Sequence, residues 1–240
     1  MPFDSCHRIS TGAPAREPVH GRTEIEFPQL ELCRPSLDDL PPISLPPGYT
    51  LRTYRPGDEV AWGEIMTPAF SPYWNLQRFR TLIQPHFGFR PERVIFVCHR
   101  ERPVGSACAF NWPGLLPSVG FIHMLGVLQS HCGQGLGHAL SLACLHRFRE
   151  EGTFQSALLQ TESFRLPAIK HYLRLGFRPV LVRGWQRKKW LQVLERLGLQ
   201  DRIEAFGVNT LPVMSDFTFY YRTMSLFTYL FWLQTIAWLR

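Results

Sequence analysis

The sequence predicts a mixed α/β fold in which helices flank a central β-sheet. Three observations lead to this fold class. Apolar runs typical of strands alternate with helical stripes through residues 48–184, two of the strands are joined by a short charged turn, and a glycine-rich loop stands between a strand and a helix. Outside this domain we expect an irregular, Pro-rich arm at residues 1–47 and a helical, hydrophobic C-terminal extension at residues 185–240.

The bulk composition indicates an ordinary globular domain with extensions. The chain has 240 residues, of which 45% are hydrophobic and 19% are charged, and this excludes wholesale disorder and collagen-like repetition. A net charge of +7 favours anionic partners, among them nucleotide phosphates, nucleic acid and acidic membrane surfaces. The six cysteines are scattered without a CxxC pair, and the first ten residues contain no apolar segment typical of a secretory signal. We therefore expect a reduced, cytoplasmic protein.

The first half of the domain contains two helices and three strands by pattern. Alternation predicts a strand at residues 49–54, and Pro56 with Asp58 marks the start of a helix within residues 56–70. A second, short helix is expected within residues 75–84. Segments 93–99 and 103–110 are joined by a charged turn, which is typical of a hairpin of two strands.

The second half continues with alternating strands and helices. A strand at residues 119–127 runs into the loop HCGQGLGHAL, and the helix after the loop ends near Gly152. A strand at 156–162, a helix entered at Pro167 and closed by Gly176, and a strand at 177–183 complete a β-α-β-α-β order. The helix after the loop has a core-facing stripe at helical spacing: Leu136, Ala139, Leu140, Ala143, Cys144 and Phe148.

The glycine loop is the clearest functional signal. A glycine-rich turn between a strand and a helix binds anions, because the NH groups of the first helical turn have no partners and the helix dipole adds positive potential. Glycine lets phosphate oxygens approach the backbone closely. Two familiar loops are excluded by spacing, since His138 and Ala139 follow Gly137 where a Walker A loop has Lys and Ser/Thr, and the dinucleotide fingerprint GxGxxG is not matched.

The segment 127–137, VLQSHCGQGLG, resembles motif A of the GNAT superfamily, the GCN5-related N-acetyltransferases, whose loop holds the pyrophosphate of acetyl-CoA. The segment 167–177, PAIKHYLRLGF, resembles the helix 4 signature of the family, and RERPVG resembles the hairpin before its third strand. The resemblance covers roughly residues 49–183 and implies the GNAT fold for the domain at 48–184. The Pro-Pro strap and FRLPAIKHYLRLGF also resemble the bacterial mycothiol synthase-like members.

The resemblance also implies the residues of the site. A backbone NH near Gly126 or Val127 would face the thioester oxygen, and Cys132 stands where the family usually has Arg or Gln, so Gln134 or Arg165 would compensate for it. Cys132 itself is expected to be a small filler and not a nucleophile. The cofactor-binding residues implied are Leu125, Gly126, Val127, Cys132, Gly133, Gln134, Gly135, Leu136, Gly137 and Arg165.

Acetyl transfer to an amine needs a proton donor for the departing thiolate and an acceptor for the amine proton. Tyr172 stands where many family members have the tyrosine that serves as the acid, and the alternative is a tyrosine that packs in the core with a satisfied hydroxyl. His123 and Glu162 are rival candidates for the base, and either could instead be a bystander. No metal site is expected, because no His or Cys cluster has ligand spacing.

The C-terminal extension contains a basic helix at residues 186–199 and an uncharged run at residues 223–239. This run of 17 residues is at or below the length needed to cross a bilayer, so burial against the domain or a dimer partner is preferred, and membrane association is left open. A surface for nucleic acid or membrane at residues 187–189 is a further reading, although no nucleic acid partner is expected.

The expected function is that of an acetyl-CoA-dependent N-acetyltransferase. The acetyl group would pass to a primary amine of a small-molecule acceptor by direct attack in a ternary complex. The alternative is a catalytically inactive, acyl-CoA-binding GNAT-like module with an interaction or membrane-associating C-terminal segment. The expected partners are acetyl-CoA and an amine acceptor, and a homodimer is left open.

Overall fold

The computed structural model describes residues 29–85, 89–111, 117–180 and 184–202. Its strands are β1 (Gln29–Arg34), β2 (Tyr49–Thr53), β3 (Val94–His99), β4 (Arg102–Phe110), β5 (Val119–Val127), β6 (Ser156–Glu162) and β7 (Arg178–Pro179). Its α-helices are α1 (Asp58–Ala69), α2 (Leu76–Arg78), α3 (Leu136–Glu151), α4 (Leu166–Arg174) and α5 (Gly184–Arg196). Short π or 3-10 turns lie at Phe79–Ile83, Pro91–Arg93, Gln129–His131 and Gln200–Arg202.

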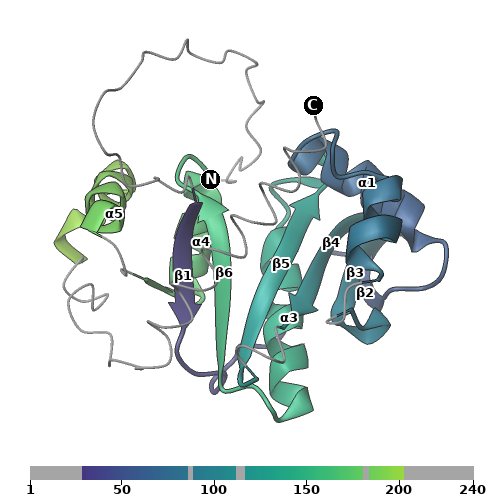
Figure 1. Ribbon diagram of the computed structural model, residues 1–240, viewed down its shortest axis with the longest axis horizontal. Helices are drawn as coiled ribbons and strands as arrows, with labels where there is room; N and C mark the ends of the chain where they lie inside the picture. Colours follow the sequence, from purple (N-terminus) through teal and green to yellow (C-terminus); the bar gives the residue numbers. More distant parts are fainter. Residues whose placement is uncertain (1–28, 86–88, 112–116, 181–183, 203–240) are drawn as a thin grey trace.

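The strands form one sheet in the order β2-β3-β4-β5-β6-β1-β7 (Figure 1). Strands β2 to β5 pair antiparallel in chain order, whereas β5 and β6 are parallel. The parallel connection runs through α3, as a crossover helix requires. The α/β class, the mixed sheet and the helices predicted between residues 56 and 175 are therefore confirmed.

Strand β1 corrects the prediction of an irregular arm up to residue 47. It inserts between β6 and β7 and runs antiparallel to both, from Gln29 opposite Glu162 to Arg34 opposite Ala157. Leu30 and Leu32 are fully buried at alternating positions, which is the pattern of a strand with one face on a core. The surrounding prolines hid this short alternation, and the pairing partner is more than 120 residues away in the chain.

The sheet has a hydrophobic core on each face. One core lies under α3, α4 and α5 and includes Leu140, Phe148, Ile169 and Trp190. The other lies under α1 and the turn after α2 and is built around Trp62, Ile65, Met66 and Phe79. Strand β7 has only two residues instead of the predicted seven, and residues 181–183 are outside the described part of the chain.

Replacing Leu32 with alanine is expected to destabilise the domain by about 2–5 kcal/mol, because a fully buried leucine in a close-packed core leaves a cavity. The measurement is the free energy of unfolding in urea. Leu191→Ala is the matched control on α5, where the side chain is 39% exposed and the change should stay within about 0.5 kcal/mol. Equal small effects would show that β1 is not part of the core.

Within the described residues, no helix is long and apolar enough to cross a membrane. The uncharged run predicted at residues 223–239 falls outside those residues, as do residues 1–28 of the N-terminal arm.

Candidate active site

Strands β5 and β6 separate near their carboxyl ends. Their parallel ladder joins Val119 with Ser156 through Ile122 with Leu159 and then stops, although β5 continues to Val127. Figure 1 shows the two strands diverging toward their arrowheads. Met124 has a positive φ of 50°, next to the place where the register with β4 shifts, and this kink accompanies the separation. Ligands of open α/β sheets bind at such carboxyl ends.

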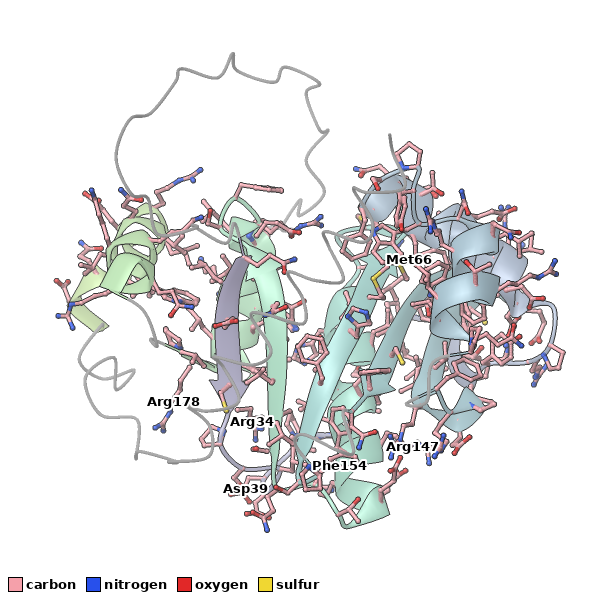
Figure 2. The ribbon with its side chains drawn as sticks, viewed as in Figure 1. Arg34, Asp39, Met66, Arg147, Phe154 and Arg178 are labelled. Atoms are coloured by element: carbon pink, nitrogen blue, oxygen red, sulfur yellow. The ribbon has the colours of Figure 1, made fainter. Side chains whose placement is uncertain are left out.

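Helix α1 covers the end of β5 on one face of this opening. A Cβ at Gly126 would come within 3.0 Å of Ala69 Cβ and 3.3 Å of Met66 Sδ, so these neighbours would have to shift by a few tenths of an ångström to make room for it. Figure 2 shows Met66 on α1 above the end of β5. The side chains of Leu125 and Val127 pack against the core on the other face. The main chain of these predicted cofactor-binding residues therefore leads directly from the strand into the glycine loop.

The glycine loop bends through two left-handed residues before α3 begins. Gly133 and Gly135 have φ values of 78° and 77°, a conformation that glycine adopts without strain. Gly135 is the N-cap of α3, and it provides no side-chain cap for the first turn. The first turn also contains no acidic residue. No side chain of this first turn therefore compensates the positive end of the helix dipole.

The NH groups of residues 133–138 form an open array of donors. Among the described residues, the helix ladder begins with Ala139 NH donating to Gly135 O, and no backbone acceptor is found for the six residues before it. Gly133, Gln134 and Gly135 are exposed, and Cys132 is half-buried with Sγ 3.5 Å from Leu128 O. The loop is therefore open to solvent, with the geometry of an anion site.

Tyr172 lies on α4 in the core beside the opening and is only 8% exposed. Burial raises its pKa to about 12, while Arg165 acts in the opposite direction. Within the described part of the chain, no protein hydrogen-bond partner is found for its hydroxyl, which is not among the fully buried polar atoms that lack a partner. The role of Tyr172 as the acid, like the alternative of a tyrosine that only packs in the core, therefore stays a prediction.

Glu162 and Arg165 bind each other, which changes the interpretation of both. Arg165 Nε donates to Glu162 Oε2 at 2.5 Å, and Gln29 Nε2 donates to Glu162 Oε1 at 3.3 Å. A second guanidinium nitrogen of Arg165 donates to the carbonyl oxygen of Ala69 at 3.1 Å, at the C-terminal end of α1. The printed contacts of Arg165 in the described residues do not include the glycine loop, and its compensation for Cys132 stays a prediction.

His123 is the first residue of β5 beyond the ladder with β6. Its ring lies 5.8 Å from that of Phe110 and 5.5 Å from that of Phe121, on the face covered by α1. Tyr172 belongs to the opposite face, so the two predicted groups flank the separated strands from different sides. The described residues contain no group of three or more metal-ligating side chains.

Two histidines that the sequence pattern did not connect meet beside the loop. His138, the third residue of α3, has its Nδ1 3.3 Å from Nδ1 of His171 on α4. Burial lowers the pKa of both, and that of His171 falls to about 4, with His138 and Arg174 adding to the effect. Upstream of the loop, the Tyr49 hydroxyl lies 2.7 Å from His131 Nδ1 and ties β2 to the start of the loop.

Acidification should destabilise the fold through His171. Its pKa is lower in the folded than in the unfolded chain, so the unfolded state binds the proton first as the pH falls below 6.5. The contribution of neutral His171 to the free energy of unfolding is present above pH 6.5 and decreases as the pH falls toward 4. About 2 kcal/mol of this contribution is lost between about pH 7 and about pH 5. Urea unfolding at several pH values checks this, and His171→Gln should flatten the dependence. An unchanged slope in that variant would contradict the assignment.

The diverging parallel strands and the open helix N-terminus together are typical of α/β proteins that hold a phosphorylated ligand at the strand ends. Residues 60–177 match the model of the Acetyltransferase (GNAT) family, and the predicted resemblance to this superfamily is thereby confirmed. A GCN5-related N-acetyltransferase from Sphaerobacter thermophilus superposes with a TM-score of 0.50 at 24% identity, over 63% of this chain and 48% of that one. The predicted GNAT fold is thereby confirmed.

Two curated relatives are similar in sequence to much of the domain. The chain is 33% identical over 156 residues to the mycothiol acetyltransferase of Thermomonospora curvata, which covers 62% of this chain and 50% of the relative. It is 31% identical over 178 residues to the mycothiol acetyltransferase of Nocardia farcinica, covering 70% of this chain and 54% of the relative. The chain thus spans about half the length of the curated relatives it matches.

Proposed function

We propose that this protein is an N-acetyltransferase that uses acetyl-CoA and transfers the acetyl group to a primary amine of a small molecule. The observation that carries the proposal is the open array of NH groups at residues 133–138, at the end of a strand that separates from its parallel neighbour. Six consecutive donors at a helix N-terminus suit a diphosphate. Acetyl-CoA, bound there, would supply an activated acetyl thioester.

The residues beside the opening suit the proton transfers of this reaction. The backbone of residues 125–127 leads from the loop along the opening, where an NH would polarise the thioester carbonyl. The Tyr172 hydroxyl would donate its proton to the departing sulfur, because it has no partner in the described residues and its high pKa keeps it protonated at neutral pH. Direct attack by the amine needs no nucleophilic side chain.

His123 is the better candidate for the base. Glu162 already accepts a hydrogen bond on each of its two carboxylate oxygens, from Arg165 and from Gln29, so both oxygens are engaged within the protein. His123→Gln is expected to lower kcat/KM at neutral pH by about a hundredfold, whereas Glu162→Gln should lower it less than about tenfold. The pH profile of kcat/KM distinguishes the two candidates. Only the His123 variant should lose the decrease of kcat/KM on the acid side of the profile. Loss of this decrease in the Glu162 variant would reverse the assignment.

The acceptor is proposed from the relatives and from the site together. Both curated relatives are named mycothiol acetyltransferases, so an acceptor of the mycothiol class is the first to test. The aromatic residues Phe70, Tyr73 and Trp74 follow α1 and are half-buried near the opening, and they would form one wall for the acceptor. Arg165 stacks over Phe70 at 5.1 Å and would hold this wall in place.

The experiment that tests this function is a transfer assay with acetyl-CoA and a panel of amines that includes the mycothiol class. Release of free CoA thiol should depend on the amine, and an acetylated amine should form in equal amount. An acetyl-CoA-binding chain that releases no CoA with any amine would overturn the proposal in favour of a catalytically inactive binding module.

A further inference from the structure

A pair of imidazoles lies between the open loop and the proposed acid. The rings of His138 and His171 have centroids 4.8 Å apart and an interplanar angle of 73°, and their Nδ1 atoms are 3.3 Å apart. The backbone NH of His138 belongs to the open array at the start of α3. His171 directly precedes Tyr172 on α4, with ring centroids 5.4 Å apart. The pair therefore connects the first turn of α3 with α4.

Among the described residues, the charged group that acts on this pair is positive. Helix α4 contains no acidic residue, and the first turn of α3 contains none. The charged group of α4 that acts on His171 is Arg174, which opposes its protonation, and Tyr172 presents a neutral ring. Leu125 on β5 is an apolar neighbour of the first turn of α3. Its Cδ2 atom lies 3.8 Å from the position that a Cβ atom at Gly137 would take. Within the described part of the chain, the two imidazoles thus have no negative charge beside them that would stabilise a proton on either ring.

The hydrogen bond between the two rings contains one hydrogen atom, which lies between the two Nδ1 atoms. Two Nδ1 atoms can share one hydrogen, so one ring donates and the other accepts. His171 Nε2 is buried, and no partner for it is found among the described residues. His138 is the less buried of the two rings and lies on the helix that presents the NH donors. An added proton is therefore stabilised best on His138.

We propose that this pair couples binding of a diphosphate to the uptake of one proton by His138. The anion held by the NH groups of residues 133–138 would provide the negative charge that the pair lacks, and the proton would come from solvent. The inference rests on the proposed function, because it takes the diphosphate of a CoA-type ligand as the anion. Each unit by which the ligand raises the pKa of His138 makes binding about tenfold tighter below that pKa than above it.

Calorimetric titration with dephospho-CoA at about pH 6 tests the inference. Dephospho-CoA keeps the diphosphate but lacks the 3′-phosphate, which itself titrates in this range. Repeating the titration in buffers with different ionisation enthalpies gives the number of protons taken up. The full chain should take up roughly half to one proton, and it should bind about tenfold more tightly at about pH 5.5 than at about pH 7.5.

The variants separate this pair from other histidines of the same helix. His138→Gln should bind without proton uptake and with an affinity that does not change with pH. His146→Gln, also on α3 but at the far end of the helix and bonded to Pro41 O, should behave like the unmodified chain. Binding without proton uptake in the unmodified chain, or equal uptake in His138→Gln, would overturn the inference and leave the proposed function standing. Absence of any binding would contradict the proposed function and this inference with it.

Discussion

Replacing Gly135 with valine is expected to weaken acetyl-CoA binding by about a hundredfold or more. Gly135 has a φ of 77° and leads into the first turn of α3, and a β-branched residue strains this conformation. The new side chain meets no protein atom within 4 Å, so it would stand in the open mouth of the loop. Loss of two hydrogen bonds to a charged ligand, at about 1.5–3 kcal/mol each, accounts for the effect. Calorimetric titration with acetyl-CoA measures it.

The other end of the same helix offers a matched control. Gly152 is the C-cap of α3, with a φ of 69° and no atom within 4 Å of a Cβ. Gly152→Val should therefore destabilise the fold by a similar amount, about 1–3 kcal/mol, and leave acetyl-CoA binding unchanged. If both variants lost binding equally, backbone strain would explain the result. If Gly135→Val bound normally, the loop would not be the diphosphate site.

Tyr172→Phe is expected to lower kcat by about a hundredfold to a thousandfold, with little change in the affinity for acetyl-CoA. The phenyl ring keeps its packing against Phe177, and no protein hydrogen bond of the hydroxyl is lost among the described residues. The effect should therefore fall on the proton transfer to the leaving sulfur and not on stability. Steady-state kinetics with the best amine, together with thermal unfolding, separate these two contributions.

Tyr54 is the control for this substitution. It is also buried, and burial raises its pKa to about 12, but its hydroxyl donates to Glu59 on the α1 face of the sheet. Tyr54→Phe should cost about 1 kcal/mol of stability and leave kcat unchanged. A Tyr172→Phe enzyme with normal kcat would show that the hydroxyl only fills space beside the opening.

Local patterns predict most of the fold because most of its elements are specified locally. The apolar stripe from Leu136 to Phe148 and the glycine caps at its two ends define α3 without knowledge of the rest of the chain. Strand β1 differs, since its stability comes from pairing with β6 and β7, far away in sequence. Only the alternation of Leu30 and Leu32 indicates it locally, and such a short signal is ambiguous beside prolines.

The residues of the site also fall into two groups, those that a local motif predicts and those that depend on tertiary packing. The glycine loop and Tyr172 follow from motifs whose spacing is contained in one segment each. The ion pair of Glu162 and Arg165 could have been expected, because the two residues are three apart in the short turn that joins β6 to α4. The contact of Arg165 with Ala69 and the pairing of His138 with His171 depend on how helices pack, and packing leaves no local pattern.

Titration of the whole chain with acetyl-CoA, with NAD as the comparison ligand, tests the central claim most directly. Both ligands contain a diphosphate, but only acetyl-CoA has the pantetheine arm that we propose to lie between the separated ends of β5 and β6. The account predicts saturable, one-to-one binding of acetyl-CoA and much weaker binding of NAD. A chain that binds no acetyl-CoA at millimolar concentration, or that prefers NAD, would contradict it.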